Sequence, residues 1–253
     1  MATQSISELL SQWSPARLQT LFAESPQQAA AGARVLALEG MPQAQLCYGR
    51  MLLEGTGTAN NKPEAFIWFT RAAAHGDLDA LNMVGRCLEN GWGTATDPAR
   101  AAGYYDKAAQ AGHAWAQYNL GHLYFDGIGV DRDLHRAYRC YLTSAEQQHT
   151  RAMNLTGRCC EEGWGTSRNF IAAANWYRRS AEGGYFRGQY NWASILLLSE
   201  REDEAAVWFD RAARAGTVGV RDAVLRLAAS STSGSALAAL GARLCADGYA
   251  LGA

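Results

Sequence analysis

Small and apolar residues recur along the chain at helical spacing, and the whole pattern returns every 36 residues. Residues 116–129 show it most clearly: their sequence AQYNLGHLYFDGIG reads as a helix followed by two glycines. The first alanine, the glycine inside the helix and the Gly-x-Gly pair behind it keep the same spacing. They stand at Ala44, Ala80, Ala116 and Ala152; at Gly49, Gly85, Gly121 and Gly157; and at Gly55/Gly57, Gly91/Gly93, Gly127/Gly129 and Gly163/Gly165. A fixed period of roughly 20–50 residues predicts a stacked array of repeats.

A second helix is predicted in each period, between the Gly-x-Gly pair and the next alanine. It follows an Asn or Asp, whose side chain accepts hydrogen bonds from the free N–H groups of a helix start. Most of these helices end before a glycine, but Gln148 stands at that position in the third period. The expected caps are Asn61, Asp97, Asp133 and Asn169, and the helices carry the pairs Trp68-Phe69, Tyr104-Tyr105, Cys140-Tyr141 and Trp176-Tyr177.

These patterns predict an all-α chain with three parts. An N-terminal helical cap with a degenerate repeat is expected over residues 1–43, with helices at about 15–23 and 26–39. A C-terminal cap with two helices is expected over residues 217–253. Between them, a tight turn near residues 199–202 shortens the last repeat. The predicted repeats are 44–79, 80–115, 116–151, 152–187 and 188–216.

The motif also resembles a known family. The stretch AQYNLGHLYFDGIGV, followed by Asp133, Ala137, Tyr141 and Ala145, is similar to the Sel-one-like repeat (SLR), a relative of the tetratricopeptide repeat. Over residues 44–216 the resemblance implies a right-handed α/α superhelical solenoid of about five 36-residue helix-pair repeats with a concave face. It also implies a non-enzymatic scaffold or adaptor without a cofactor, which binds a partner protein or peptide and rarely performs chemistry.

Composition narrows the function further. The 253 residues carry a formal net charge of −1, which argues against bulk attraction to nucleic acid or to an anionic membrane. The N-terminal residues do not match a secretory signal, and no segment reaches the ~18 apolar residues of a membrane helix. Six cysteines without a CxxC pair are therefore expected to be reduced core thiols in a cytoplasmic protein.

One face of the first helix of each repeat stays polar at positions four residues apart. In tetratricopeptide-like arrays this face lines the concavity, so the resemblance places a peptide groove here. Arginines would bind the carboxylates of an acidic segment by charge-assisted hydrogen bonds, asparagines would hold the peptide backbone, and tyrosines would add apolar contact. The predicted partner-binding residues are Arg50, Asn82, Arg86, Tyr118, Asn119, His122, Asn154, Arg158, Tyr190 and Asn191.

Other interpretations of these residues stay open. The face would also be stable as a solvated surface, because it holds three i, i+4 ion pairs worth ~0.2–0.5 kcal/mol each. These pairs are Arg50–Glu54, His122–Asp126 and Arg158–Glu162. Two tryptophans inside Gly-Trp-Gly turns, Trp92 and Trp164, either anchor a partner or pack over the neighbouring turn.

The signals for a catalytic site are weak. Cys159 and Cys160 are adjacent and would point about 100° apart on a helix, which makes a poor chelate. The histidines lack the HxxxH and HExxH spacings of metal sites, and the chain has neither a nucleophile elbow nor a phosphate-binding loop. An enzyme with a small thiol- or metal-based site at Cys159 or His122 stays as an alternative, as does a self-associating structural subunit.

Overall fold

The computed structural model describes residues 24–250, and every regular element in that range is an α-helix. The all-α prediction is therefore confirmed, whereas the helix expected at 15–23 lies outside the described residues. The chain divides into two compact units, residues 1–132 and 133–253. Each unit is described by itself below.

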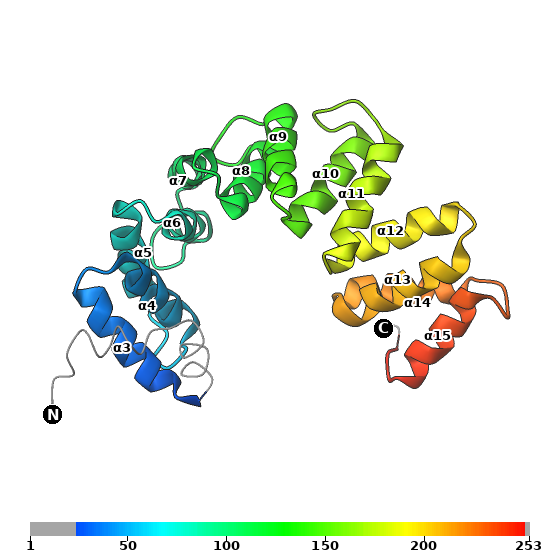
Figure 1. Cartoon of the computed structure of the whole chain (residues 1–253), viewed down its shortest axis with the longest axis horizontal. Coiled ribbons are helices and arrows are strands. Elements are labelled where there is room, and N and C mark those ends of the chain that lie inside the picture. The colour runs from blue at the N-terminus through cyan, green and yellow to red at the C-terminus, as the bar shows by residue number, and fades with distance from the viewer. Residues whose placement is uncertain (1–23, 251–253) are drawn as a thin grey trace. The chain divides into compact units, whose positions relative to one another are not determined.

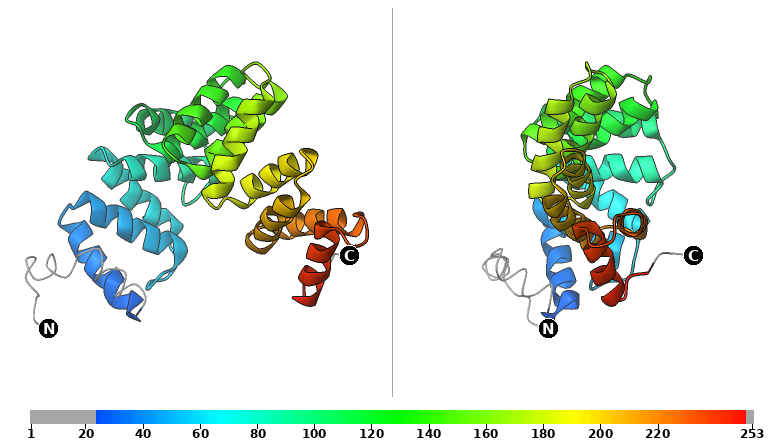
Figure 2. Two further views of the ribbon diagram at one scale, coloured as in Figure 1. Left: turned by 45° about the vertical axis from the view of Figure 1, so that its right-hand side comes forward. Right: turned by 90° about the vertical axis from the view of Figure 1, so that its right-hand side faces the viewer.

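The first unit consists of helices that pack against their neighbours in sequence. Its described helices are α3 (Pro26–Leu38), α4 (Pro42–Glu54), α5 (Lys62–Ala74), α6 (Leu78–Asn90), α7 (Pro98–Gln110) and α8 (Ala114–Asp126). Figure 1 and Figure 2 show α4 beside α5 and α6 beside α7. Helices α4, α6 and α8 are the first helices of successive repeats, so they carry those residues of the predicted groove that lie in this unit.

The second unit continues the same plan and ends in two further helices. Its described helices are α9 (Leu134–Glu146), α10 (Thr150–Glu162), α11 (Phe170–Glu182), α12 (Phe186–Leu198), α13 (Glu202–Ala215), α14 (Val218–Ala229) and α15 (Ala236–Ala246). The predicted tight turn joins α12 to α13, with Glu200 in the left-handed region at φ 59°. Leu240 of α15 and Val224 of α14 are buried in one core cluster with Phe209 of α13, so the terminal helices cover the end of this unit.

Four of the described helices, α5, α7, α9 and α11, begin at the side-chain caps that were predicted. Each expected cap on a second helix accepts a hydrogen bond from the backbone N–H three residues later; these caps are Asn61, Asp97, Asp133 and Asn169. The first helices use residues that the sequence analysis did not identify. Asp77 caps α6, and the imidazole Nδ1 atoms of His113 and His149 cap α8 and α10. Histidine is not among the favoured N-cap residues, which is why these caps were missed.

Glycine inside the first helix lets the second helix approach closely. A Cβ atom at Gly85 would lie 2.6 Å from a ring carbon of Tyr105, which is fully buried. The same close contact occurs between Gly49 and Phe69, and in the second unit between Gly157 and Tyr177. The second member of each aromatic pair therefore fills the space between the two helices of a repeat.

The Gly-x-Gly turns end the first helices and also join neighbouring repeats. Gly91 ends α6 in the left-handed region at φ 69°, where a side chain would be strained. A Cβ atom at Gly93 would lie 2.1 Å from the carbonyl oxygen of Lys62, so this turn packs on the first residue of α5 in the preceding repeat. Gln148 has a φ of 65°, because the backbone there keeps the conformation that glycine has in the other repeats.

Candidate functional site

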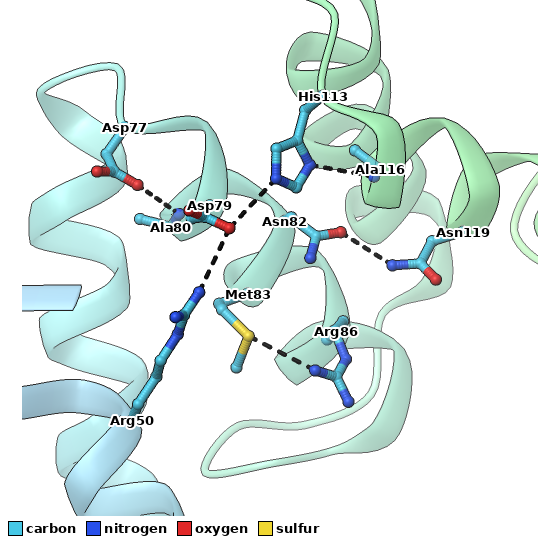
Figure 3. Close-up of polar contacts among 10 residues, drawn as sticks. All are labelled: Arg50, Asp77, Asp79, Ala80, Asn82, Met83, Arg86, His113, Ala116 and Asn119. Carbon is cyan, nitrogen blue, oxygen red and sulfur yellow. Dashed lines mark hydrogen bonds and ion pairs between the residues drawn. The ribbon is translucent and has the colours of Figure 1, made fainter. Parts of the chain in front are cut away.

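A groove of about 580 Å³ lies on the first unit and is lined mainly by residues of α4 and α6. Three predicted partner-binding residues, Arg50, Asn82 and Arg86, line it. Two tryptophans do so as well, Trp92 from the turn after α6 and Trp115 from the first turn of α8. Figure 3 shows the polar contacts at this groove. The first helices of three successive repeats thus contribute to one recess.

An ion-pair network crosses the groove and centres on Asp79 of α6. Its Oδ1 atom lies 3.3 Å from the Arg50 guanidinium of α4 and 3.3 Å from His113 Nε2 at the start of α8 (Figure 3). His113 Nδ1 accepts the Ala116 N–H, so the ring proton of the neutral imidazole sits on Nε2 and points at Asp79. The hydrogen bond from His113 and the Arg50 charge hold the pKa of Asp79 below its ordinary value, despite partial burial.

The amides of Asn82 and Asn119 meet between neighbouring repeats. Asn119 Nδ2 of α8 donates to Asn82 Oδ1 of α6 at 2.9 Å. Asn82 is 7% exposed, so it is not the solvent-facing residue that the polar column predicted. In Figure 3 its amide nitrogen points toward the side of the groove where Met83 and Arg86 lie. Among the described residues, this nitrogen has no hydrogen-bond partner, and neither has Asn119 Oδ1.

Arg86 is held against the aromatic ring that follows its own helix. Its guanidinium lies 4.9 Å from the centroid of the Trp92 ring, and Nη1 is 3.7 Å from the Met83 sulfur. Stacking on a ring face leaves the N–H groups at the edge of the guanidinium available for hydrogen bonds. One helical turn further, Tyr105 donates to the Glu89 carboxylate at 2.6 Å, which fixes α7 against α6.

Tyr118 and His122 pack against each other on α8. Their ring centroids are 4.6 Å apart in an edge-on arrangement. Burial lowers the pKa of His122, although Asp126 and Glu89 oppose this effect. His122 is half-buried, so it is less accessible than the polar face of the sequence analysis implied.

The second unit holds the remaining predicted residues. Asn191 Nδ2 of α12 donates to Asn154 Oδ1 of α10 at 2.8 Å. The Arg158 guanidinium lies 4.9 Å from the centroid of the Trp164 ring. Tyr190 packs edge-on against Phe209 at 5.3 Å, so its ring belongs to the core of this unit.

The proposed i, i+4 ion pairs do not account for these arginines. Arg50 pairs with Asp79 on the next repeat instead of Glu54 on its own helix. Arg158 stacks on Trp164, and its guanidinium forms no ion pair with Glu162 among the described residues. The two tryptophans of the Gly-Trp-Gly turns are thus partly buried supports for arginines rather than freely exposed anchors.

Sequence reasoning missed Asp79, His113 and Trp115 at the groove. A signal existed, since Asp79 and Trp115 occupy the same position of successive repeats, four residues before Met83 and Asn119. Residues four apart share a helix face, so a groove that includes residue 83 also reaches residue 79.

The buried thiols of Cys87 and Cys159 are unsuited to nucleophilic chemistry. Burial raises the pKa of Cys87 to about 11 and that of Cys159 to about 12, so both stay protonated near pH 7. None of the six cysteines, all within the described residues, forms a disulfide, but the core prediction holds for only Cys87, Cys159 and Cys160, because Cys47 and Cys140 are half-buried and Cys245 is exposed. Within residues 24–250, His, Cys, Asp and Glu side chains form no group of three or more that would hold a metal ion.

A family model described as the Sel1 repeat matches five segments of the chain: residues 42–77, 78–113, 116–149, 150–185 and 187–217. Together these segments cover more than half of the sequence. No curated protein matches the chain. Within the described range, no helix has both the length and the apolar character needed to cross a membrane.

Several solved structures are similar in fold. The crystal structure of a Sel1 repeat protein from Oxalobacter formigenes has a TM-score of 0.78 and 24% identity, over 85% of this chain and 90% of that one. The protective antigen c5321 of uropathogenic Escherichia coli, which has an SLR fold, has a TM-score of 0.74 and 24% identity. That match covers 96% of this chain and 55% of c5321. Immunity protein Pa5087 from Pseudomonas aeruginosa is more distant, with a TM-score of 0.53 and 15% identity over 81% of this chain and 83% of that one.

Proposed function

Because the chain belongs to the Sel1 repeat family, whose members are typically protein-interaction scaffolds, we propose that it is a non-enzymatic scaffold that binds a partner protein in the groove of the first unit. One observation carries this proposal. Arg50, Asn82 and Arg86 come from two successive repeats, yet they line one recess of about 580 Å³. An extended segment of the partner fits such a recess better than a flat protein surface does.

The polar groups of the groove match the needs of an extended peptide. The Asn82 amide nitrogen donates to a peptide carbonyl, and Asn119, which lies outside the groove lining, donates to Asn82 Oδ1 and so orients this amide. The hydrogen bond between the two side chains fixes both amides in advance, which lowers the entropic cost of binding.

The arginines and aromatic rings supply the side-chain contacts. Arg86 is preoriented by Trp92 to bind a carboxylate with two parallel hydrogen bonds. Trp115 is 45% exposed and lines the groove, so it offers an apolar surface to the same segment. Arg50 is already paired with Asp79, so Arg86 is the stronger carboxylate ligand of the two.

A pull-down from native cell lysate tests the proposal with three forms of the full chain. The test form is Arg50→Ala/Arg86→Ala, which removes one ion-paired and one tryptophan-stacked arginine from the groove. The control form is Arg71→Ala/Arg100→Ala, which removes one tryptophan-stacked and one ion-paired arginine from the second helices of the same unit. Circular dichroism confirms that all three are folded.

We expect wild type and the control form to capture the same protein and the test form to lose it. Equal capture by all three forms would place the partner elsewhere and refute the groove. A measured mass that rises with protein concentration, together with capture of the chain itself alone, would favour the self-associating subunit.

A further inference from the structure

The repeats of this chain alternate between two types, so that the true structural period is two repeats. Residues 85–94 read GRCLENGWGT and residues 157–166 read GRCCEEGWGT, 72 residues apart. The intervening repeats lack this tryptophan. They share instead a glutamine that directly follows the position of the repeated alanine in the first helix. These glutamines are Gln45, Gln117 and Gln189.

The contacts alternate with the sequence. The Asn82–Asn119 bond of 2.9 Å returns as the Asn154–Asn191 bond of 2.8 Å. The distance from arginine to tryptophan ring is 4.9 Å both for Arg86 with Trp92 and for Arg158 with Trp164. The hydrogen bond from the buried tyrosine to a carboxylate also returns, at 2.6 Å for Tyr105 with Glu89 and 2.5 Å for Tyr177 with Glu161.

We infer that the face of the second unit around Asn154, Arg158 and Trp164 is a second copy of the groove, and that it binds an extended acidic peptide segment. This inference rests on the function proposed for the first groove. Seven of the ten residues that line the first groove have their equivalents, 72 positions later, within the second unit. The chain therefore carries two sites of one design, with different specificity.

The difference in specificity follows from charge. Among those seven positions, the first groove has two cations, Lys62 and Arg86, and the carboxylate of Asp79. The second copy has three arginines and no carboxylate: Arg151 replaces Asp79, Arg187 replaces Trp115, and Arg158 replaces Arg86. All three are exposed. Arg158 and Arg187 form no ion pair among the described residues, and each lies over an aromatic ring.

The backbone-binding groups are also present in the second copy. Asn154 is 3% exposed and accepts from Asn191, and its own amide nitrogen has no hydrogen-bond partner among the described residues. Such an amide, beside three arginines, provides donors for both the carbonyls and the carboxylates of an acidic segment. Nucleic acid phosphates share the charge but not the alternating N–H and C=O groups that the paired asparagines match.

Fluorescence anisotropy tests the inference with the full chain and the labelled peptide (Glu-Gly)₅ as the probe. We expect binding that weakens with salt, and a loss of about tenfold or more in affinity for Arg158→Ala/Arg187→Ala. The control Arg178→Ala/Arg211→Ala removes the same number of arginines from this unit, but from the second helices, where one is ion-paired and one is ring-stacked, and it should bind as wild type does. Arg151→Asp, which installs the carboxylate of the first groove, should weaken binding as well.

Several results would contradict the second site or its selectivity. Undiminished binding by Arg158→Ala/Arg187→Ala, or no binding of (Glu-Gly)₅ by wild type, overturns the second site. Equal binding of (Lys-Gly)₅ overturns its selectivity for acids, and equal binding of a ten-nucleotide oligothymidine shows a general polyanion surface instead. If the pull-down through the first groove succeeds while these tests fail, the proposed scaffold function stands and only the second site falls.

Discussion

Two alanine substitutions at helical glycines should have opposite effects on stability. Gly85 in α6 faces the ring of Tyr105, whereas Gly103 in α7 is exposed and a Cβ atom there would meet nothing within 4 Å. Both lie inside helices, where alanine is better than glycine by about 0.8–1 kcal/mol. Gly103→Ala should therefore stabilise the protein by about 0.5–1 kcal/mol.

For Gly85→Ala, the steric term exceeds the helical gain. The new Cβ atom would lie 2.6 Å from the ring, against at least 3.4 Å for an ordinary contact, so ring or helix must shift by about 0.8 Å. Overpacking of this kind costs about 1–3 kcal/mol. The same shift strains the 2.6 Å hydrogen bond from Tyr105 to Glu89, which adds about 1 kcal/mol. The expected net effect is a destabilisation of about 1–3 kcal/mol.

Urea denaturation followed by circular dichroism measures both effects. Repeating Gly85→Ala in a chain that also carries Tyr105→Ala tests whether the contact with the ring causes the destabilisation. Once the ring is removed, Gly85→Ala should become neutral or stabilising, which gives a coupling energy of about 1–3 kcal/mol between the two positions. The reasoning fails if Gly85→Ala raises the midpoint as Gly103→Ala does. It also fails if the effect of Gly85→Ala is the same with and without the ring.

Three further outcomes are expected. Gln148→Gly should raise the free energy of unfolding by about 0.5–1 kcal/mol in urea denaturation, because a φ of 65° strains a residue with a side chain; no change would show that Gln148 is unstrained. Asp79 has a lowered pKa, so its stabilising contribution is present above its ordinary value of 3.8 and is lost as the pH falls through the lower folded value. NMR titration should find that pKa below 3.8. In Asp79→Asn, the free energy of unfolding should fall less steeply as the pH is lowered, by less than about 1 kcal/mol in total, since the carboxylate is half exposed. An alkylating probe should label exposed Cys245 first and buried Cys159 only on unfolding, whereas rapid labelling of Cys159 would revive a thiol-based site.

Much of the fold could be predicted from the sequence because its determinants are local. A capping Asn or Asp acts within three residues of its own position, and a glycine that adopts positive φ ends the helix that it directly follows. The helices after Asn61 and Asp97, and the turn after Leu198, were therefore placed correctly. His113 was missed as a cap because its role depends on one ring nitrogen and on the carboxylate that binds the other.

The groove was predictable only in part, since its contacts join residues of different repeats. Spacing along one helix paired Arg50 with Glu54, but Asp79 on the next repeat is its actual partner. The same limit applies to Asn82, which the polar column made a surface residue. Its burial depends on Asn119, whose side chain arrives from the following repeat.

Within a repeat, some positions pack in the core and others contact solvent. The proposed second site can therefore differ in specificity from the first groove while the fold is kept. Gly85 and Gly157 must stay small, because Tyr105 and Tyr177 pack against them in the core. The second residue of each first helix from α6 onward is under no such constraint, since its side chain is exposed. It changes from aspartate to tryptophan to arginine in successive repeats, at residues 79, 115, 151 and 187, while the helices around it keep their packing. Substitutions in this column should therefore change which ligand is bound without a matching loss of stability, whereas substitutions at the glycines should do the reverse.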